Sequence, residues 1–252
     1  MNVPVDVLTM EQSLEVIESA IEKKEHIRHG VINAGKVVAM QSDKALFDSV
    51  AESNMINADG FGIVWASEKL GGSLPERVAG IDLMQALVER AGQKGYRIFF
   101  FGAREEVVKA VVEKYTRIHG KEIIAGFRNG YFSDEEETSI AKEIAETGAD
   151  ILFVAMSSPK KEYFLHRQCE ILNSIPFIMG VGGSFDVVSG KVKRAPMWMQ
   201  KLGLEGLARF LQEPKRMWKR FVVDNYKFIR LVWTWKKKGN AIGDWESNDA
   251  ES

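Results

Sequence analysis

The chain has 252 residues, of which 45% are hydrophobic and 27% charged, as is typical of a globular protein with a buried core. It contains no run of about 18 apolar residues, which excludes a membrane-spanning helix, and its first residues lack the pattern of a signal peptide. The net charge of −1 gives the whole molecule no strong electrostatic field, and the single cysteine, Cys169, excludes an internal disulfide and suits a reducing cytoplasm.

Short β-rich runs alternate with amphipathic stretches along the chain. The predicted strands cover residues 3–8, 29–34, 55–59, 96–102, 150–156 and 176–182. A capping box at Thr9 and Gln12 opens the first predicted helix, which runs to about Glu22. Further helices are predicted over 42–53, over 81–95 with its end at Gly95, from about Arg104, after Ser133 with Glu136, and between 156 and 176.

Near-continuous apolar strands separated by helices predict an α/β fold with a Rossmann-like, mostly parallel sheet and helices on both faces. Ligands of such sheets bind beyond the carboxyl ends of the strands. Small residues stand at several of these ends and leave room for a ligand against the backbone. They are Asn33-Ala34-Gly35, Ala58-Asp59-Gly60, Gly102-Ala103, Ser157-Ser158-Pro159 and Gly182-Gly183-Ser184.

Asp59 is the acidic residue at one of these strand ends, and two interpretations of it compete. As an N-cap it accepts an amide hydrogen from the following helix, which is the more common role of an Asp in this position. As a group facing a pocket, near Asn33 and Asn57, it serves as a general base, a role worth roughly 10²–10⁴ in rate. The local pattern alone leaves both open.

Several common site patterns are absent from the sequence. The Gly60-x-Gly62 pair lacks the third glycine of a dinucleotide fingerprint because Trp65 stands there, and no phosphate-binding loop with Gly-Lys-Ser/Thr occurs. The run from Gly182 is no nucleophile elbow because Asp186 stands where that motif needs glycine. With basic residues after it, this run is consistent either with a binding site or with a tight turn and surface helices.

A metal site is not expected. His26 and His29 lie in a charged stretch, where we expect them to be solvated, and the other two histidines are far away in the sequence. No two aspartates are separated by a single residue, so the D-x-D cation site of many nucleotide-sugar enzymes is missing. An anionic leaving group must therefore meet Arg, Lys or helix N-termini.

The C-terminal part differs from the rest. Nine Lys or Arg stand against two acidic residues between 213 and 238. A helical projection of residues 216–235 gathers most apolar residues, three tryptophans among them, opposite five basic ones. This favours a helix in an anionic membrane interface over a helix packed on the core, and both over a nucleic-acid-binding tail. We therefore predict a catalytic core over 1–193, a helical appendage over 194–240 that contacts the membrane through 215–238, and a disordered tail over 241–252.

Taken together, a series of short motifs resembles one family, the WecG/TagA/CpsF glycosyltransferases of bacterial cell-surface polysaccharide synthesis. The resemblance covers about residues 2–230. The motifs are Asn33; Ala58-Asp59-Gly60-x-Gly62; Glu76-Arg77-Val78-x-Gly80-x-Asp82-Leu83; Gly130-Tyr131-Phe132; Pro159-Lys160-x-Glu162; Gly180 to Asp186; Arg194-Ala195-Pro196; Gly203-Leu204-Glu205; and Glu213-Pro214-x-Arg216.

This resemblance implies an inverting, metal-independent transfer of a sugar from a UDP-sugar to a polyprenyl-diphosphate-linked saccharide, with no cofactor, at the inner face of the cytoplasmic membrane. It implies that Asp59 is the general base and that Arg216 and Arg220 of the appendage close over the nucleotide diphosphate. It implies that Asn33 and Arg77 lie in the substrate pocket, and we expect Lys161, Gly102, Gly182, Gly183 and Asp186 to bind substrate there as well. Nucleic acid is not an expected partner, and a homo-oligomer is left open.

Three positions depart from the family pattern. Val31 stands where a threonine is common, Lys161 where a glutamine is common, and the Ser157-Ser158 pair where a glycine is usual. The hypothesis is that these changes alter the choice of donor, so that N-acetylmannosamine is not assumed. Lys161 then faces the carboxylate of a uronic acid or helps to hold the diphosphate.

Two rival functions stay open on the sequence. One is a nucleotide-dependent oxidoreductase, and the other is a membrane- or nucleic-acid-binding module without catalysis.

Overall fold

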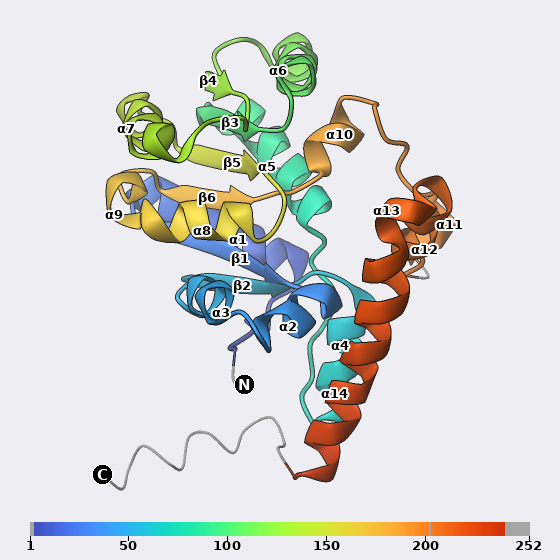
Figure 1. Ribbon diagram of the computed structural model, residues 1–252. Helices are drawn as coiled ribbons and strands as arrows, with labels where there is room; N and C mark the ends of the chain where they lie inside the picture. Colours follow the sequence, from blue (N-terminus) through green and yellow to red (C-terminus); the bar gives the residue numbers. More distant parts are fainter. Residues whose placement is uncertain (1–2, 202, 240–252) are drawn as a thin grey trace, which may run out of the picture.

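The computed structural model describes residues 3–201 and 203–239, and its centre is a sheet of six parallel strands (Figure 1). The strands lie in the order β2-β1-β6-β5-β3-β4, and every neighbouring pair is parallel. Their bounds are β1 Ile27–Ile32, β2 Met55–Ala58, β3 Ile98–Gly102, β4 Ile124–Arg128, β5 Ile151–Ala155 and β6 Phe177–Gly180. The predicted α/β class is confirmed.

Helices cover both faces of the sheet. One face packs in a single apolar cluster with α1 (Met10–Lys23), α5 (Gly80–Lys94), α6 (Glu105–His119) and α10 (Ser184–Val188). The other face packs with α2 (Ala34–Met40), α3 (Lys44–Ala51), α4 (Phe61–Lys69), α7 (Glu137–Glu146), α8 (Lys160–Arg167) and α9 (Cys169–Leu172). Because both faces are covered, the central strands β3 and β5 are buried at every residue, which explains their unbroken apolar sequences.

Local sequence features fix where several helices begin or end, as predicted. Thr9 caps α1 through a complete capping box with Gln12. Gly95 ends α5 in the left-handed conformation, at φ +77°. Ser133 forms a capping box with Glu136 at the 3₁₀ turn η1 (Asp134–Glu136), which leads into α7.

One prediction of secondary structure was wrong, and one short helix was missed. The segment 3–8 is irregular and not a strand, although Asp6 N donates to Ile56 O (2.9 Å) beside β2. The carboxylate of Asp6 also accepts a hydrogen bond from Ile56 N (2.6 Å). A side-chain oxygen therefore occupies the position where a paired strand would place a backbone carbonyl. The short helix α2, which begins after its N-cap Asn33, was not predicted.

The chain after residue 194 is helical and forms a column along one side of the molecule (Figure 1). Its elements are α11 (Met197–Lys201), α12 (Glu205–Gln212), α13 (Pro214–Trp218), the π-helical stretch η2 (Lys219–Asp224) and α14 (Asn225–Lys237). Phe228 and Val232 of α14 are buried in one cluster with α2 and α4. Part of the predicted apolar face therefore packs on the core. The predicted tail over 241–252 lies outside the described residues.

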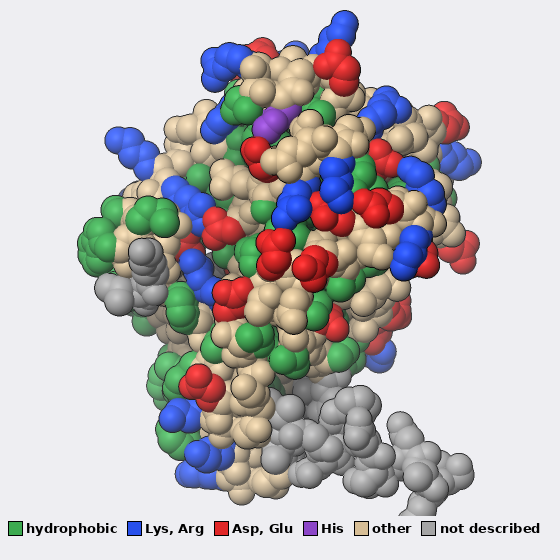
Figure 2. Space-filling view, turned by 180° about the vertical axis from the view of Figure 1, so that it is seen from behind, with side chains coloured by type: hydrophobic (Ala, Val, Ile, Leu, Met, Phe, Trp, Pro, Cys, Tyr) green, Lys and Arg blue, Asp and Glu red, His purple; other side chains and the backbone are tan. Residues whose placement is uncertain are grey.

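Other apolar side chains of this column are exposed. Seen from behind, hydrophobic side chains gather at the left margin over these helices, whereas acidic and basic side chains are mixed across the centre (Figure 2). Trp198, Leu211 and Trp218 are each more than half exposed. Within the described part of the chain, no helix combines the length and the hydrophobicity needed to cross a bilayer.

Candidate active site

Asp59 follows β2 at the carboxyl edge of the sheet, beside the end of β1. Its backbone N donates to Ile32 O (2.8 Å), so the two strand ends are held together, and its side chain is half-buried. The N-cap of α4 is Gly60, at φ +120°. Asp59 therefore stands one residue before the N-cap position that the capping interpretation of the sequence gave it. Asn33 does cap a helix, because its Oδ1 accepts from Lys36 N (3.0 Å) at the start of α2.

Two lysines and one glutamate form a buried group below this edge. Lys36 of α2 and Lys161 of α8 place their ammonium groups 2.9 and 2.8 Å from Glu162 Oε1. Each of the three residues is 7% exposed. Lys36 also donates to Val31 O (2.6 Å), and the stem of Lys161 lies so close to Gly180 that a methyl group there would meet its Cε at 2.8 Å. The group thus joins α2 and α8 across the end of β6.

The charges of this group act on each other and on Asp59. Burial alone would raise the pKa of Glu162, but the attraction of Lys36 and Lys161 outweighs it and lowers the pKa to about 2. Burial lowers the pKa of Lys36, while the negative charges of Glu162 and Asp59 oppose that shift. Asp59 is therefore close enough to Lys36 for their charges to interact.

A second buried polar group lies within the sheet. His29 of β1 is 3% exposed, contrary to the expectation that it is solvated, because β1 lies between β2 and β6. Its Nε2 lies 2.8 Å from Asn57 Oδ1, and Asn57 Nδ2 donates to Ser13 Oγ (3.2 Å). Burial lowers the pKa of His29 to about 4, so the imidazole is neutral at pH 7.

Arg77 and the helices after residue 194 meet next to Asp59. Arg77 Nη1 donates to Glu205 Oε2, and its Nη2 donates to Gln200 O (3.3 Å). The guanidinium also lies 5.0 Å from the centre of the Phe61 ring, two residues after Asp59. Chain segments 120 or more residues apart in sequence thus come together at the carboxyl edge of β2.

The turn after β6 carries another cation. A methyl group on Gly183 would lie 2.6 Å from Arg209 Nη2, so the guanidinium of this α12 residue packs against the turn. Gly182 has φ +53° and nothing within 4 Å of the place where a Cβ would stand. Asp186 is paired loosely with Lys191, at 3.8 Å.

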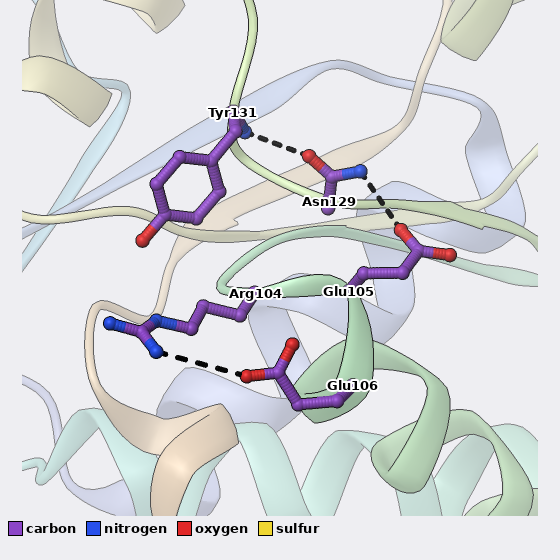
Figure 3. Close-up of a pocket in the computed structure, with 5 residues that line it drawn as sticks. All are labelled: Arg104, Glu105, Glu106, Asn129 and Tyr131. Atoms are coloured by element: carbon purple, nitrogen blue, oxygen red, sulfur yellow. Dashed lines mark hydrogen bonds and ion pairs between the residues drawn. The ribbon is translucent and has the colours of Figure 1, made fainter.

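An open hollow of about 410 Å³ lies at the carboxyl ends of β3 and β4 (Figure 3). It is lined by Arg104, Glu105, Glu106, Asn129 and Tyr131. Asn129 ties its two sides together, since its Nδ2 donates to Glu105 Oε2 (2.8 Å) and its Oδ1 accepts from Tyr131 N (2.9 Å). Within the described residues, no group of three His, Cys, Asp or Glu side chains is arranged to hold a metal ion.

Comparison with known proteins assigns the chain to a family. Residues 1–241 match the family described as the glycosyl transferase WecG/TagA/CpsF family. The chain belongs to the WecG/TagA/CpsF family. The resemblance seen in the sequence motifs is therefore confirmed, as is the prediction that the protein is an enzyme of the glycosyltransferase class.

Two curated relatives in this glycosyltransferase family carry the same name, N-acetylglucosaminyldiphosphoundecaprenol N-acetyl-β-D-mannosaminyltransferase. The protein of Bacillus subtilis (strain 168) is 40% identical over 191 residues, which is 76% of this chain and 73% of the relative. The protein of Bacillus spizizenii (strain ATCC 23059 / NRRL B-14472 / W23) is 38% identical over 185 residues, which is 73% of this chain and 70% of the relative.

The structure brings most of the predicted site residues of this family member to the carboxyl edge of the sheet. Asn33 and Asp59 follow neighbouring strands, Gly182 and Gly183 follow β6, and Lys161 lies below them in the buried group. Gly102 ends β3, at φ +117°, where a methyl group would lie 2.5 Å from Ala155 O, so this glycine is required by the packing of β3 on β5. The side chains of Arg216 and Arg220 lie outside the described part of the chain. The role of each residue stays a prediction.

Sequence reasoning gave no role to four charged residues that the structure puts at this edge. Lys36 was overlooked because helix α2 was not predicted. Glu162 and Glu205 lie in motifs quoted for the family, and Arg209 lies in the same helix as Glu205. Each of them contacts a residue that is distant along the chain, namely Lys36, Arg77 and Gly183 respectively. Of the four, only Lys36 stands within a few residues of the end of a strand, β1, and so had a local indication in the sequence.

Proposed function

We propose that the protein transfers a glycosyl group from a UDP-sugar to a saccharide linked through a diphosphate to a polyprenol, at the inner face of the cytoplasmic membrane. The two Bacillus relatives are named for transfer to such a lipid-linked acceptor. The observation that carries the proposal for this chain is the position of Asp59: half-buried at the carboxyl edge of the sheet, beside Asn33, and not the N-cap of the next helix.

Asp59 is the general base of the proposed reaction. The hydroxyl oxygen of the acceptor forms a bond to the anomeric carbon of the donor, and its proton passes to the Asp59 carboxylate. The bond from the anomeric carbon to the β-phosphate oxygen breaks, and UDP leaves with that electron pair. A single displacement of this kind inverts the anomeric configuration.

Cationic side chains stabilise the departing diphosphate in this proposal, without a metal ion. Arg209 lies against the turn at Gly183, and Arg216 and Arg220 follow in the next helical stretches. Guanidinium groups suit this role because they bind phosphate oxygens in pairs and stay charged. The metal-independent part is tested by adding a chelator, which is expected to leave turnover unchanged.

The donor is the open point, and Lys161 is the residue that bears on it. Its ammonium is buried and paired with Glu162, so a carboxylate or phosphate of the donor must compete with that glutamate. UDP-N-acetylmannosamine, UDP-N-acetylglucosamine and UDP-uronic acids are offered to the parent and to Lys161→Gln with a short-chain diphosphate-linked acceptor. A changed donor profile supports the specificity role of Lys161, and an identical profile contradicts it.

Helix α14 and the stretch before it are the proposed membrane contact. Trp218, Ile229 and Trp233 are between 46% and 57% exposed, and Lys227 and Arg230 are exposed as well. Tryptophans and basic side chains on one helix favour an interface with anionic lipid headgroups.

Asp59→Asn tests the central claim. The amide accepts no proton, so turnover is expected to fall by roughly 10²–10⁴ while donor binding is largely kept. Asp48→Asn is the matched control, because Asp48 pairs with Lys44 on the exposed surface of α3. Unchanged turnover in Asp59→Asn would contradict the role of Asp59 as the general base.

The two rival functions of the sequence analysis, a nucleotide-dependent oxidoreductase and a binding module without catalysis, are set aside by membership of the glycosyltransferase family.

A further inference from the structure

Glu205 lies between two arginines, Arg77 of the core and Arg194, which stands just before the helical column. Its Oε2 accepts from Arg77 Nη1, and its Oε1 lies 3.5 Å from Arg194 Nη2. Arg194 Nη2 in turn lies 2.6 Å from Asp82 Oδ1 of helix α5. Four charges of alternating sign thus connect Arg77 and Asp82 of the core to Glu205 of the helical column and to Arg194 just before it.

The side chains of this group are partly shielded from water, so the attraction between their charges is stronger than in an ordinary surface ion pair. The Arg77 side chain is 16% exposed, Arg194 24% and Glu205 26%. Gln200 is buried and adds a backbone carbonyl to the second Nη of Arg77, while its own side chain donates to Ala195 O (2.6 Å). Both Nη groups of Arg77 are therefore engaged by the helical column.

The ring of Phe61 packs between the core and the helical column, next to the Arg77–Glu205 pair. The Phe61 ring contacts the guanidinium of Arg77 on the core and the backbone of Gly203 in the column. It lies so close to Gly203 that a methyl group on this glycine would clash with it. Gly203 has φ +73°, which further requires glycine. Phe61 opens α4, so the helical column is fixed two residues from Asp59.

We propose that Arg77 is a positioning residue, which through Glu205 docks the helical column beside Asp59, and whose Nη groups serve this contact and not a substrate phosphate. This inference rests on the proposed function, in which Asp59 is the base and the column supplies cations to the leaving group. Docking would set the distance between the base and those cations, and misplacement by about 1 Å costs on the order of 10²-fold in rate.

A charge swap tests the proposal. Because Arg194 also faces Glu205, the swap is made in an Arg194→Gln background, so that the cation introduced at position 205 meets no second one. Arg77→Glu, Glu205→Arg and the pair together are compared with this background. Lys94→Glu is the control, since Lys94 pairs with Glu22 at the opposite edge of the sheet.

Hydrogen exchange of the amides in 197–201 and 203–208 is measured without substrate, and kcat and KM are measured separately. Each single swap is expected to speed the exchange and to lower kcat/KM by about 10²-fold, whereas the pair together recovers protection and at least about tenfold of the activity. Lys94→Glu is expected to change neither. If Arg77 binds substrate itself, the pair recovers protection but not activity, which overturns the proposal.

Unchanged exchange in both single variants also overturns it, because the arginine and glutamate then do not hold the column. Glu205→Gln, which keeps shape and removes charge, replaces the reversal if a swapped protein fails to fold. The exchange measurement needs no donor, so the docking is tested even if the proposed reaction is wrong.

Discussion

Lys36 Nζ lies 2.9 Å from Glu162 Oε1, and both side chains are buried beneath the carboxyl edge of the sheet. The lysine belongs to the helix that follows β1 and the glutamate to the helix that follows β5, so one ion pair holds two of the loops that frame the candidate site. Removal of one member leaves an uncompensated charge in a region of low dielectric, and this makes the pair testable.

Glu162→Gln is expected to lower the free energy of unfolding by about 3–5 kcal/mol, because two buried ammonium groups lose their counter-charge. Lys161→Gln is expected to cost less, since Glu162 keeps Lys36. Urea denaturation of the three proteins at pH 7 measures both differences. Equal midpoints for Glu162→Gln and the parent would contradict the buried ion pair.

The same carboxylate predicts a dependence of stability on pH. Its pKa is lowered from 4.5 to about 2 by the two lysines, so its contribution is present above pH 4.5 and is lost as the pH falls through about 2. The shift corresponds to about 3 kcal/mol. The parent is expected to lose this stability between pH 4.5 and 2, and Glu162→Gln is expected to show a flatter profile in that window.

His29 predicts a second window at higher pH. Burial lowers its pKa from 6.5 to about 4, so between these values the unfolded chain binds a proton that the folded chain does not. Stability therefore falls from pH 6.5 down to about 4, by about 3 kcal/mol in all. His29→Leu is expected to be less stable at pH 7 but to lack this slope; an unchanged slope would show that another group causes it.

Two glycines at strand ends are expected to respond differently to alanine. Gly102→Ala combines φ +117° with a contact of 2.5 Å to Ala155 O, so we expect a loss of more than about 3 kcal/mol. Gly182→Ala meets no atom within 4 Å and is expected to cost only about 1–2 kcal/mol for its left-handed backbone. If substrate lies at this turn, Gly182→Ala lowers kcat/KM by more than its loss of stability explains. Thermal melts and kinetics on the same preparations measure the two effects.

Helix α14 offers a matched pair of apolar residues. Phe228→Ala removes a buried side chain and is expected to cost about 3–5 kcal/mol. Trp233→Ala removes a ring that is 47% exposed, so we expect little change in stability but weaker binding to anionic vesicles. Vesicle sedimentation with neutral lipid as control measures this. Unchanged binding by Trp233→Ala would remove that ring from the proposed contact.

The layered fold could be predicted from the sequence because its information is local. Continuous apolar strands such as β3 and β5 follow from burial on both faces, and the caps at Thr9 and Gly95 fix helix ends through neighbouring residues. Segment 3–8 misled this reasoning, since Val3 and Val5 pack on the core without forming a ladder and Val7 is exposed.

The site was predictable only in part. Asp59 stands out as an acid between a buried strand and a glycine, and Asn33 as a polar strand end. Arg77 and Glu205, by contrast, are 128 residues apart, and no periodicity or spacing indicates that they pair. His29 was misjudged because its charged neighbours in sequence are not its neighbours in the sheet.

The irregular segment before α1 has a consequence for association between molecules. Strand β2 is the outer strand on its side of the sheet, and Asp6 engages both the amide and the carbonyl of Ile56. An outer strand with unpaired backbone groups is a template for another chain to add to, and a carboxylate placed on it discourages such growth. Extension of the sheet by another chain is thereby blocked at Ile56 of the β2 edge.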